Sequence, residues 1–239
     1  EPGGFVSAPI YASVSGTVKK IGEMLGSNGR MMQTVEIESD GLDARWEGIA
    51  PPKLETMQDF LDAVRASGLV GLGGAGFPTV VKLTVKNLDQ IKCVIINGAE
   101  CEPYITGDHR TMLERPEQII GGATYLAKMF GVDKVVIGVE DNKQNGIDSL
   151  NACIKEKNAP VVVESLHCRY PQGGEKQLCQ AITGKQVPPG GLPSNIGCAV
   201  FNINTTCAIF RAITTGIPVV KKIVTVSGSG VVEPKNIEC

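Results

Sequence analysis

Three short apolar runs, separated by stretches of helical periodicity, constrain the fold of this 239-residue chain more than any other feature. The runs are Cys93–Ile96, Lys134–Val139 and Val161–Leu166. Helices are expected at about 55–66, 112–130, 143–156, 176–183 and 205–215. Strands that alternate with helices are typical of βαβ units, and such units form a parallel sheet. The sequence therefore predicts an α/β domain.

Composition excludes two classes of protein. Charged residues make up 20% of the chain, the net charge is −2, and basic residues form no tract, which argues against nucleic acid as a partner. Apolar residues make up 42%, but they form no uninterrupted run of about 18, so direct membrane insertion is not expected. These values are ordinary for a globular protein in water.

Strand-like segments flank the α/β region. Residues 5–38 alternate over 5–10, 12–18 and 34–38, and Ala8-Pro9 with Ser15–Val18 resembles half of the sandwiched barrel of biotin- and lipoyl-carrier domains. A carrier needs a lysine at a hairpin tip, and none is placed there, so a structural barrel is favoured. Because the chain opens at Glu1 without Met, and a strand-like run at 223–226 lies close to its end, we expect a piece of a longer protein. The expected domains are 1–50, 51–218 and 219–239.

The cysteines predict no metal site. There are eight, and no two have the C-x-x-C spacing of a zinc ribbon or a ferredoxin-type cluster. Several lie in apolar surroundings, which favours reduced, buried thiols. His109 is expected to be a surface residue, and Asp108 before it to cap a helix.

A glycine-rich segment is the least ordinary part of the sequence. Residues 68–76 contain five glycines, and Gly71–Gly76 satisfies G-x-G-x-x-G. The dinucleotide fingerprint needs a preceding strand and an acidic residue about 20 positions on, but a helix precedes this loop and Ile96 is apolar. A loop of this kind still lets the backbone approach an anionic or flat group. If Pro78 opens a helix, Lys82 is placed to reach a phosphate; a tight connection that binds nothing is the alternative.

Polar residues follow the run Cys93–Ile96. Asn97, Glu100 and Glu102 lie where ligands of α/β sheets bind, beyond the carboxyl end of a strand. Carboxylates in this position can hydrogen-bond ribose hydroxyls or a carboxamide. A solvated acidic turn remains the plain alternative.

Two further loops combine polar and glycine residues. Tyr170–Glu175 places an aromatic ring and a carboxylate around Gly173-Gly174, so Tyr170 could stack on a planar ring. The alternative is a simple helix entry. Phe201–Thr206 is a polar strand-to-helix junction, whose plain interpretation is N-capping by Asn204 or Thr205.

Three of these motifs, in this order, resemble the RnfC family, the C subunits of Rnf electron-transport complexes. The most specific are Gly73–Thr79, Asn97–Pro103 and Tyr170–Glu175. The family includes the proline-reductase-associated electron-transfer protein and cobalamin reductase relatives, and it is distantly similar to the NADH-binding flavoprotein subunit of respiratory complex I. The resemblance implies a Rossmann-like, parallel-sheet FMN/NADH-binding domain of the complex I flavoprotein type. A partial β barrel-sandwich module would precede it, and the start of a β-grasp domain would follow.

The resemblance also implies the binding residues. The glycine loop would wrap FMN, Lys82 would hold its phosphate, and the acidic turn would hold the isoalloxazine edge and NADH. The expected cofactor-binding residues are Gly71, Gly73, Gly74, Ala75, Gly76, Phe77, Lys82, Asn97, Glu100, Glu102, Tyr170, Gly173, Gly174, Glu175, Asn202, Asn204, Thr205 and Thr206. No residue is expected to act as general acid or base, and none to bind a metal.

Four positions depart from the complex I pattern. Leu72 stands in place of an arginine, Ala99 in place of an aspartate, Gly174 in place of a glutamate, and Ile203 in place of an asparagine. The lost carboxylates weaken the case for nicotinamide binding more than the case for FMN. The pattern is nearer to the Rnf branch.

The resemblance implies a flavoprotein electron-entry module that oxidises NADH through FMN. Its 4Fe-4S clusters would lie in a C-terminal segment outside this chain, and its partners would be other subunits of an electron-transfer complex. It would be cytoplasmic, or peripheral on the inner face of the cell membrane. Two alternatives remain: an FMN electron-transfer protein with a non-nicotinamide partner, such as a proline reductase or corrinoid system, and a non-catalytic docking subunit of the same fold.

Overall fold

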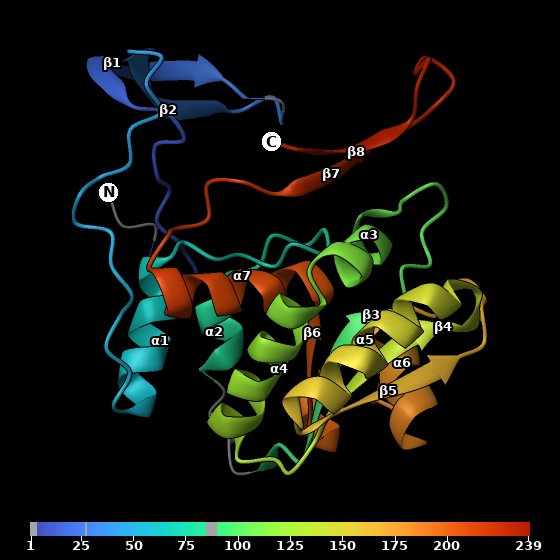
Figure 1. The fold of residues 1–239 in the computed structure, drawn as a ribbon. Coiled ribbons are helices and arrows are strands. Elements are labelled where there is room, and N and C mark those ends of the chain that lie inside the picture. Colours follow the sequence, from blue (N-terminus) through green and yellow to red (C-terminus); the bar gives the residue numbers. More distant parts are fainter. Residues whose placement is uncertain (1–3, 27, 85–89) are drawn as a thin grey trace.

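A four-stranded parallel sheet lies at the centre of the computed structural model, which describes residues 4–26, 28–84 and 90–239 (Figure 1). Its strands are β3 (Cys93–Gly98), β4 (Val135–Glu140), β5 (Val161–Leu166) and β6 (Cys198–Asn202). They are hydrogen-bonded in the order β5-β4-β3-β6, all parallel. The predicted α/β class with a parallel sheet is confirmed.

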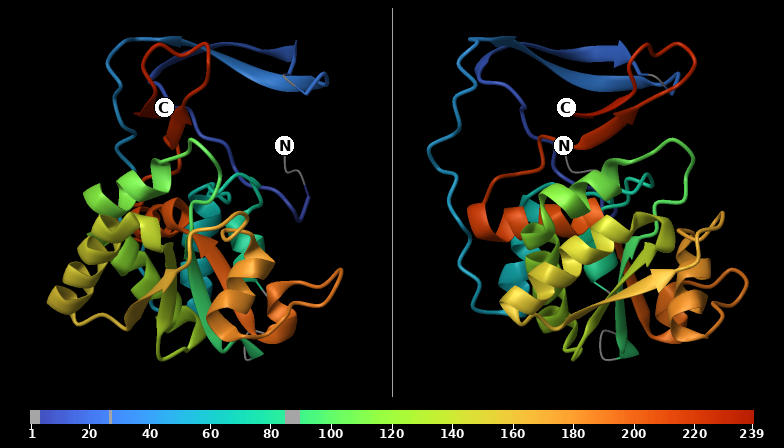
Figure 2. Two further views of the ribbon diagram at one scale, coloured as in Figure 1. Left: turned by 90° about the vertical axis from the view of Figure 1, so that its right-hand side faces the viewer. Right: turned by 45° about the vertical axis from the view of Figure 1, so that its right-hand side comes forward.

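Helices cover both faces of this sheet (Figure 2). One face packs against α1 (Met57–Ala66), α2 (Thr79–Leu83), α3 (Gly107–Glu114), α4 (Pro116–Phe130), α5 (Gln144–Lys157) and α7 (Ile203–Thr215). The opposite face packs against α6 (Glu175–Thr183) and the short 3₁₀ helix η3 (Pro193–Ile196). Adjacent Ile95 and Ile96 are both fully buried, one on each face, which explains why the predicted strands are continuous apolar runs.

Local sequence sets the ends of these helices. Thr56 and Asp59 form a capping box at the start of α1. Pro116 opens α4, where its missing N–H costs nothing, and Gly131 ends the helix in a left-handed conformation. The predicted helices are present, but the one predicted over 112–130 is divided: α4 begins at Pro116, and residues 112–114 belong to α3.

Two antiparallel hairpins lie outside the α/β layers, on the side of α3 and α7 (Figure 1). They are β1 (Gly16–Leu25) with β2 (Met31–Ser39), and β7 (Ile223–Val226) with β8 (Lys235–Glu238). The predicted strand over 34–38 lies within β2, the one predicted over 12–18 begins only at Gly16, and the prediction of a strand over 5–10 is wrong. That segment runs past the end of α1, where the Tyr11 hydroxyl donates to the carbonyl of Ala66, and Pro9 within it has no N–H for a ladder.

The predicted domain limits at 50/51 and 218/219 stay predictions, as does the β-grasp assignment of the last hairpin, and residues 1–3 lie outside the described part. Within the described ranges, none of the helices has both the length and the apolar character needed to span a membrane.

Candidate functional site

The sheet contains one point at which the strand order reverses. From β3 the chain crosses to β4 on one side, and later returns to β6 on the other side. Asn97 near the end of β3 is in register with Asn202 at the end of β6. Ligands of open α/β sheets bind outside the carboxyl ends of strands at such a switch point. The fold therefore places two of the predicted residues where a ligand is expected.

A pocket of about 720 Å³ opens at this point and continues along β6. Its size falls in the range of roughly 300–1,000 Å³ that is usual for small-molecule and cofactor sites. The predicted residues that line it are Gly71, Gly73, Ala75, Phe77, Lys82, Asn97, Gly173, Glu175, Asn202 and Thr205. The structure thus brings together residues from all four predicted segments.

The glycine loop forms one wall of the pocket and is closed on itself. The Gly71 N–H donates to the Phe77 carbonyl at 2.7 Å, and the Gly76 N–H to the Gly71 carbonyl at 3.2 Å. The Leu72 N–H donates to Thr205 Oγ1 at 2.9 Å, which fastens the loop to the first turn of α7. A Cβ at Gly73 would lie 3.0 Å from the Asn202 Cβ, so a side chain there would crowd Asn202, which also lines the pocket.

Lys82 points into the pocket from α2, which begins directly after Pro78 as predicted. Its Nζ lies 2.6 Å from Glu175 Oε1 and 5.7 Å from the centre of the Phe201 ring. Both side chains of this ion pair are more than one third exposed, at 38% and 39%. The cation that the sequence predicted for a phosphate therefore faces the pocket and is paired with a carboxylate.

Asn97 joins the acidic turn to the loop before α6. Its Nδ2 donates to the Gly173 carbonyl at 2.8 Å, and its Oδ1 accepts from the Ala99 N–H at 3.1 Å. A Cβ at Gly173 would lie 2.1 Å from the Ala99 carbonyl oxygen, so only glycine fits at this contact. Two motifs that are about 75 residues apart in the sequence form one wall as a result.

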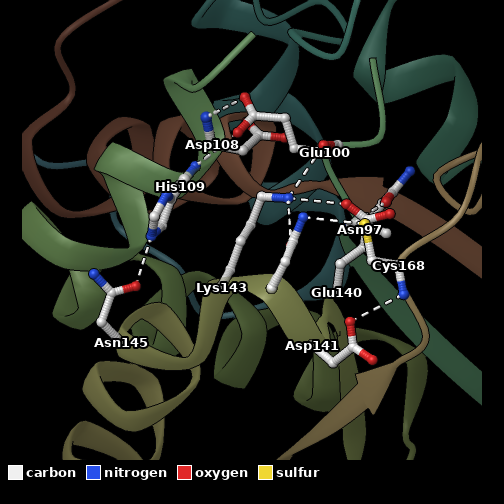
Figure 3. A network of polar contacts seen from close by, with 11 residues as sticks. Asn97, Glu100, Asp108, His109, Glu140, Asp141, Lys143, Asn145 and Cys168 are labelled. Atoms are coloured by element: carbon white, nitrogen blue, oxygen red, sulfur yellow. Dashed lines mark hydrogen bonds and ion pairs between the residues drawn. The ribbon is translucent and has the colours of Figure 1, made fainter. Parts of the chain in front are cut away.

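Glu100 is not among the residues that line the pocket, and its side chain points toward the start of α3 (Figure 3). Its carboxylate accepts from the backbone N–H groups of Asp108 at 2.8 Å and His109 at 3.1 Å. These are free donors in the first turn of α3, and a carboxylate there is favoured by hydrogen bonding and by the helix dipole. Glu102, the other predicted acid of this turn, is exposed and also lies outside the lining.

Asp108 is a functional candidate that sequence reasoning assigned only to helix capping. The residue before α3 is Thr106, and the Asp108 carboxylate instead accepts from Asn202 Nδ2 at 2.7 Å and Asn204 Nδ2 at 2.6 Å. Burial, and then the charge of Glu100, raise the pKa of Asp108 to about 7. No local sequence pattern predicts this contact, because Asp108 and its partners are more than 90 positions apart in the sequence.

A second ion pair, also missed at the sequence level, lies at the end of β4. Lys143, in the 3₁₀ helix η2 (Asp141–Lys143), is 2.9 Å from Glu140, and both side chains are almost fully buried. The lysine also donates to Asn142 Oδ1 at 3.2 Å and to the Glu100 carbonyl at 3.3 Å (Figure 3). The sequence offers one signal for this pair: a glutamate ends an apolar strand, and a lysine follows three positions later.

The remaining predicted residues surround the pocket without lining it. Gly74 and Gly76 complete the loop with φ of +116° and +61°. Tyr170 is 67% exposed, and Gly174 precedes the first turn of α6. Asn204 contacts Asp108, and the buried Thr206 hydroxyl donates to the Asn202 carbonyl within α7. The helix cap is Asn202 itself, rather than Asn204 or Thr205.

The lining suits a planar ring compound that carries an anionic group. Ala75, Phe77, Val81 and Val200 supply apolar surface, while Lys82 supplies a positive charge. Thr79 also lines the pocket, and its buried Oγ1 has no hydrogen-bond partner within residues 4–26, 28–84 and 90–239. Such an orphaned hydroxyl is costly unless a ligand or water completes it. A phosphorylated flavin fits these donors and walls.

Family comparisons agree with this geometry. Residues 64–211 match the Nuo51 FMN-binding domain family, and residues 1–42 match the RnfC barrel sandwich hybrid domain. A structure of an NAD+-reducing NiFe hydrogenase in the H2-reduced state superimposes with a TM-score of 0.67 at 25% identity. That match covers 77% of this chain and 37% of the other.

Curated relatives belong to multi-subunit complexes. The chain is 44% identical to the C subunit of the Na(+)-translocating ferredoxin:NAD(+) oxidoreductase complex of Acetobacterium woodii, over 100% of this chain and 54% of the relative. It is 41% identical to the proton-translocating counterpart of Clostridium ljungdahlii, over 98% of this chain and 51% of the relative. The chain thus spans about half the length of these relatives. It belongs to the Nuo51 FMN-binding domain family, and within it to the RnfC branch.

Proposed function

We propose that this chain binds FMN in the switch-point pocket and acts as an electron-entry module, which oxidises NADH and passes electrons to iron–sulfur clusters outside these residues. The carrying observation is the pocket itself, where the glycine loop, Lys82 and the carboxyl ends of β3 and β6 meet. It lies within the segment that matches an FMN-binding domain family.

Lys82 is the residue that would hold the FMN phosphate. Its ammonium already faces the pocket, and its pairing with Glu175 is exposed enough for a second anion to compete. A charge-assisted hydrogen bond to a phosphate oxygen is stronger than one between neutral groups. The Thr79 hydroxyl supplies a further donor, one turn before Lys82.

FMN, when bound, supplies the chemistry of accepting a hydride and releasing electrons singly. The residues of the chain bind and orient it. The loop from Gly71 to Phe77 lies against one side of the pocket, while Asn97 and Gly173 form the other wall. Glu100, Glu102 and Glu175 are proposed to orient the flavin edge and the nicotinamide, and no residue is assigned as acid or base.

The proposed partners are the other subunits of an ion-translocating oxidoreductase complex, because the curated relatives carry that name. The corresponding location is the cytoplasmic side of a membrane complex, in peripheral contact with it.

The function is tested by loading the protein with FMN, removing free flavin and adding NADH without oxygen. We expect a retained flavin absorption band, and we expect NADH to bleach it. A retained band that NADH leaves unchanged would overturn the nicotinamide part of the proposal alone. The absence of a retained band would overturn the FMN part and would leave the docking-subunit alternative.

A second candidate is an FMN module that exchanges electrons with a protein rather than with NADH. Two of the carboxylates proposed for nicotinamide are already engaged: Glu100 caps α3, and Glu175 pairs with Lys82. Ala99 also supplies no carboxylate at the turn. In this case a reduced protein donor would bleach the flavin and NADH would not.

A further inference from the structure

The hydrogen bonds around Asp108 fix one amide and leave another free to turn. Asn202 Oδ1 accepts from the N–H groups of Asn204 at 2.9 Å and Thr205 at 3.3 Å, at the start of α7. Since that oxygen is committed, Asn202 must present its Nδ2 to Asp108. One carboxylate oxygen of Asp108 therefore always faces a donor.

Asn204 meets the other carboxylate oxygen and has two possible orientations. Thr111 Oγ1 lies 2.9 Å from Asn204 Oδ1 and 2.8 Å from the Gly107 carbonyl, but a hydroxyl carries a single proton and donates to one of them. When Thr111 donates to Gly107, its oxygen is free to accept from Asn204 Nδ2. The turned amide then presents Oδ1 to Asp108, and a hydrogen bond there requires a proton on the carboxyl group.

The two arrangements of this network differ by one proton, and the network reaches the pocket. Asn202 lines the pocket, and Thr205, one turn into α7, holds the glycine loop through Leu72. A negative charge in the pocket is therefore separated from the Asp108 carboxylate by the Asn202 amide, which lines the pocket and donates to Asp108. Like charges repel each other, and a proton on Asp108 removes that repulsion.

Few other titratable groups act on Asp108. Glu100, from the turn after β3, raises its pKa, and Lys143, from η2, lowers it. On α7, burial and, to a smaller extent, the charge of Asp108 raise the pKa of the Cys207 thiol. His109, on α3 itself, is hydrogen-bonded to Asn145 of α5. From β7, the uncharged residues Ile223 and Thr225 lie beside the start of α3.

We propose that Asp108 takes up a proton when a flavin nucleotide enters the pocket, and that the Asn204 amide turns so that its Oδ1 accepts a hydrogen bond from the protonated carboxyl group. This inference rests on the proposed function, because the nucleotide phosphate is the charge that drives it. Reciprocity requires that the same coupling tightens nucleotide binding as the pH falls. The pKa of about 7 places the response near neutral pH.

Titration calorimetry of FMN binding, repeated at pH 7.5 in buffers with different ionisation enthalpies, counts the protons taken up. An anion that raises the proton affinity of Asp108 tenfold gives an uptake of about half a proton per FMN bound at this pH. We expect this for the wild type and for the surface control Asp133→Asn, and none for Asp108→Asn. Riboflavin, which has no phosphate, is expected to bind with little uptake in all three proteins.

Equal uptake in Asp108→Asn and wild type would overturn the proposal, as would equal uptake with riboflavin and FMN. Thr111→Val provides a second test, because it keeps Asp108 and removes the acceptor that the turned amide needs. We expect reduced uptake in this variant, and unchanged uptake would contradict the amide turn.

The unfolding of the protein without flavin separates this proposal from the proposed function. Because the folded state raises the pKa of Asp108, it binds the proton more tightly than the unfolded state between about pH 4 and 7. The free energy of unfolding of the wild type, relative to Asp108→Asn, should fall as pH rises through this window and level off above it. If the free energy of unfolding shows this pH dependence but FMN does not bind, the proposed function fails and the coupling fails with it. If FMN binds but the window is absent, only the Asp108 proposal fails.

Discussion

Two lysine–glutamate pairs lie on either side of the turn that follows β3, and they differ in their contact with water. Lys82 and Glu175, on the β6 side, are joined at 2.6 Å and are 38% and 39% exposed. Lys143 and Glu140, on the β4 side, are joined at 2.9 Å and are 10% and 2% exposed. The chemistry of the pairs is the same, and the surroundings decide what each can do.

The buried pair is fixed because neither charge has an alternative partner in water. Lys143 adds hydrogen bonds to Asn142 and to the Glu100 carbonyl, so it also holds the turn in place. The pocket pair is screened by solvent, and its contribution to stability is small. It can therefore give way to a ligand anion, and this difference predicts which substitutions affect folding and which affect binding.

The largest expected effect is that of Lys143→Met. It leaves the Glu140 carboxylate buried without a partner, so the free energy of unfolding should fall by about 3–5 kcal/mol. Urea unfolding measures this change. Lys157→Met is the matched control, because its ion pair with Glu117 spans 3.7 Å at the surface. If the two variants lose the same stability, the buried pair has no special structural role.

Lys82→Ala should have the next largest effect, and on binding rather than folding. Loss of a charge-assisted contact to the phosphate should weaken FMN binding by about 1.5–3 kcal/mol, which is roughly 10- to 150-fold. Unfolding should change by less than about 1 kcal/mol because the pair is exposed. Fluorescence titration with FMN and with riboflavin measures the binding. Equal weakening of both flavins would contradict the assignment of Lys82 to the phosphate.

Thr205→Val tests the fastening of the glycine loop to α7. The Leu72 N–H loses its acceptor, which should cost about 1 kcal/mol and speed hydrogen exchange at that amide. Thr205→Ser keeps the hydroxyl and should retain the slow exchange. Fast exchange of the Leu72 amide in the wild type would show that the loop is not held in this way.

The smallest effect is expected for Glu175→Gln. Stability should change by less than about 1 kcal/mol, and FMN should bind up to about threefold more tightly, because Lys82 no longer has a competing carboxylate. The same flavin titration measures it. A loss of FMN affinity as large as that of Lys82→Ala would mean that Glu175 itself holds the flavin.

Features fixed by neighbouring residues were predictable from the sequence. The strand Cys93–Gly98 and the helix from Pro116 to Phe130 follow from apolar runs and from proline and glycine at the ends. Residues 5–10 alternate like a strand, yet Tyr11 ties this region to α1 through a contact 55 positions away. Alternation alone does not reveal such a contact.

The same limit applies to the site. The position of the glycine loop and Lys82 at a pocket was predictable, because a run of glycines followed by proline and lysine is itself a recognisable sequence pattern. The capping role of Glu100 and the contact of Asp108 with Asn202 were not, because they depend on how α3 and α7 pack against each other. Acidic residues beyond a strand suggest ligand binding, and the structure shows that one of them, Glu100, also caps a helix.

Binding of FMN in the switch-point pocket is the property on which the proposed function depends. The most direct measurement is the visible absorption spectrum of the full chain after incubation with FMN and removal of free flavin by gel filtration. We expect a retained band near ~450 nm for the wild type, and a strongly reduced band for Lys82→Ala. A wild-type protein that folds but retains no flavin would contradict FMN binding in this pocket.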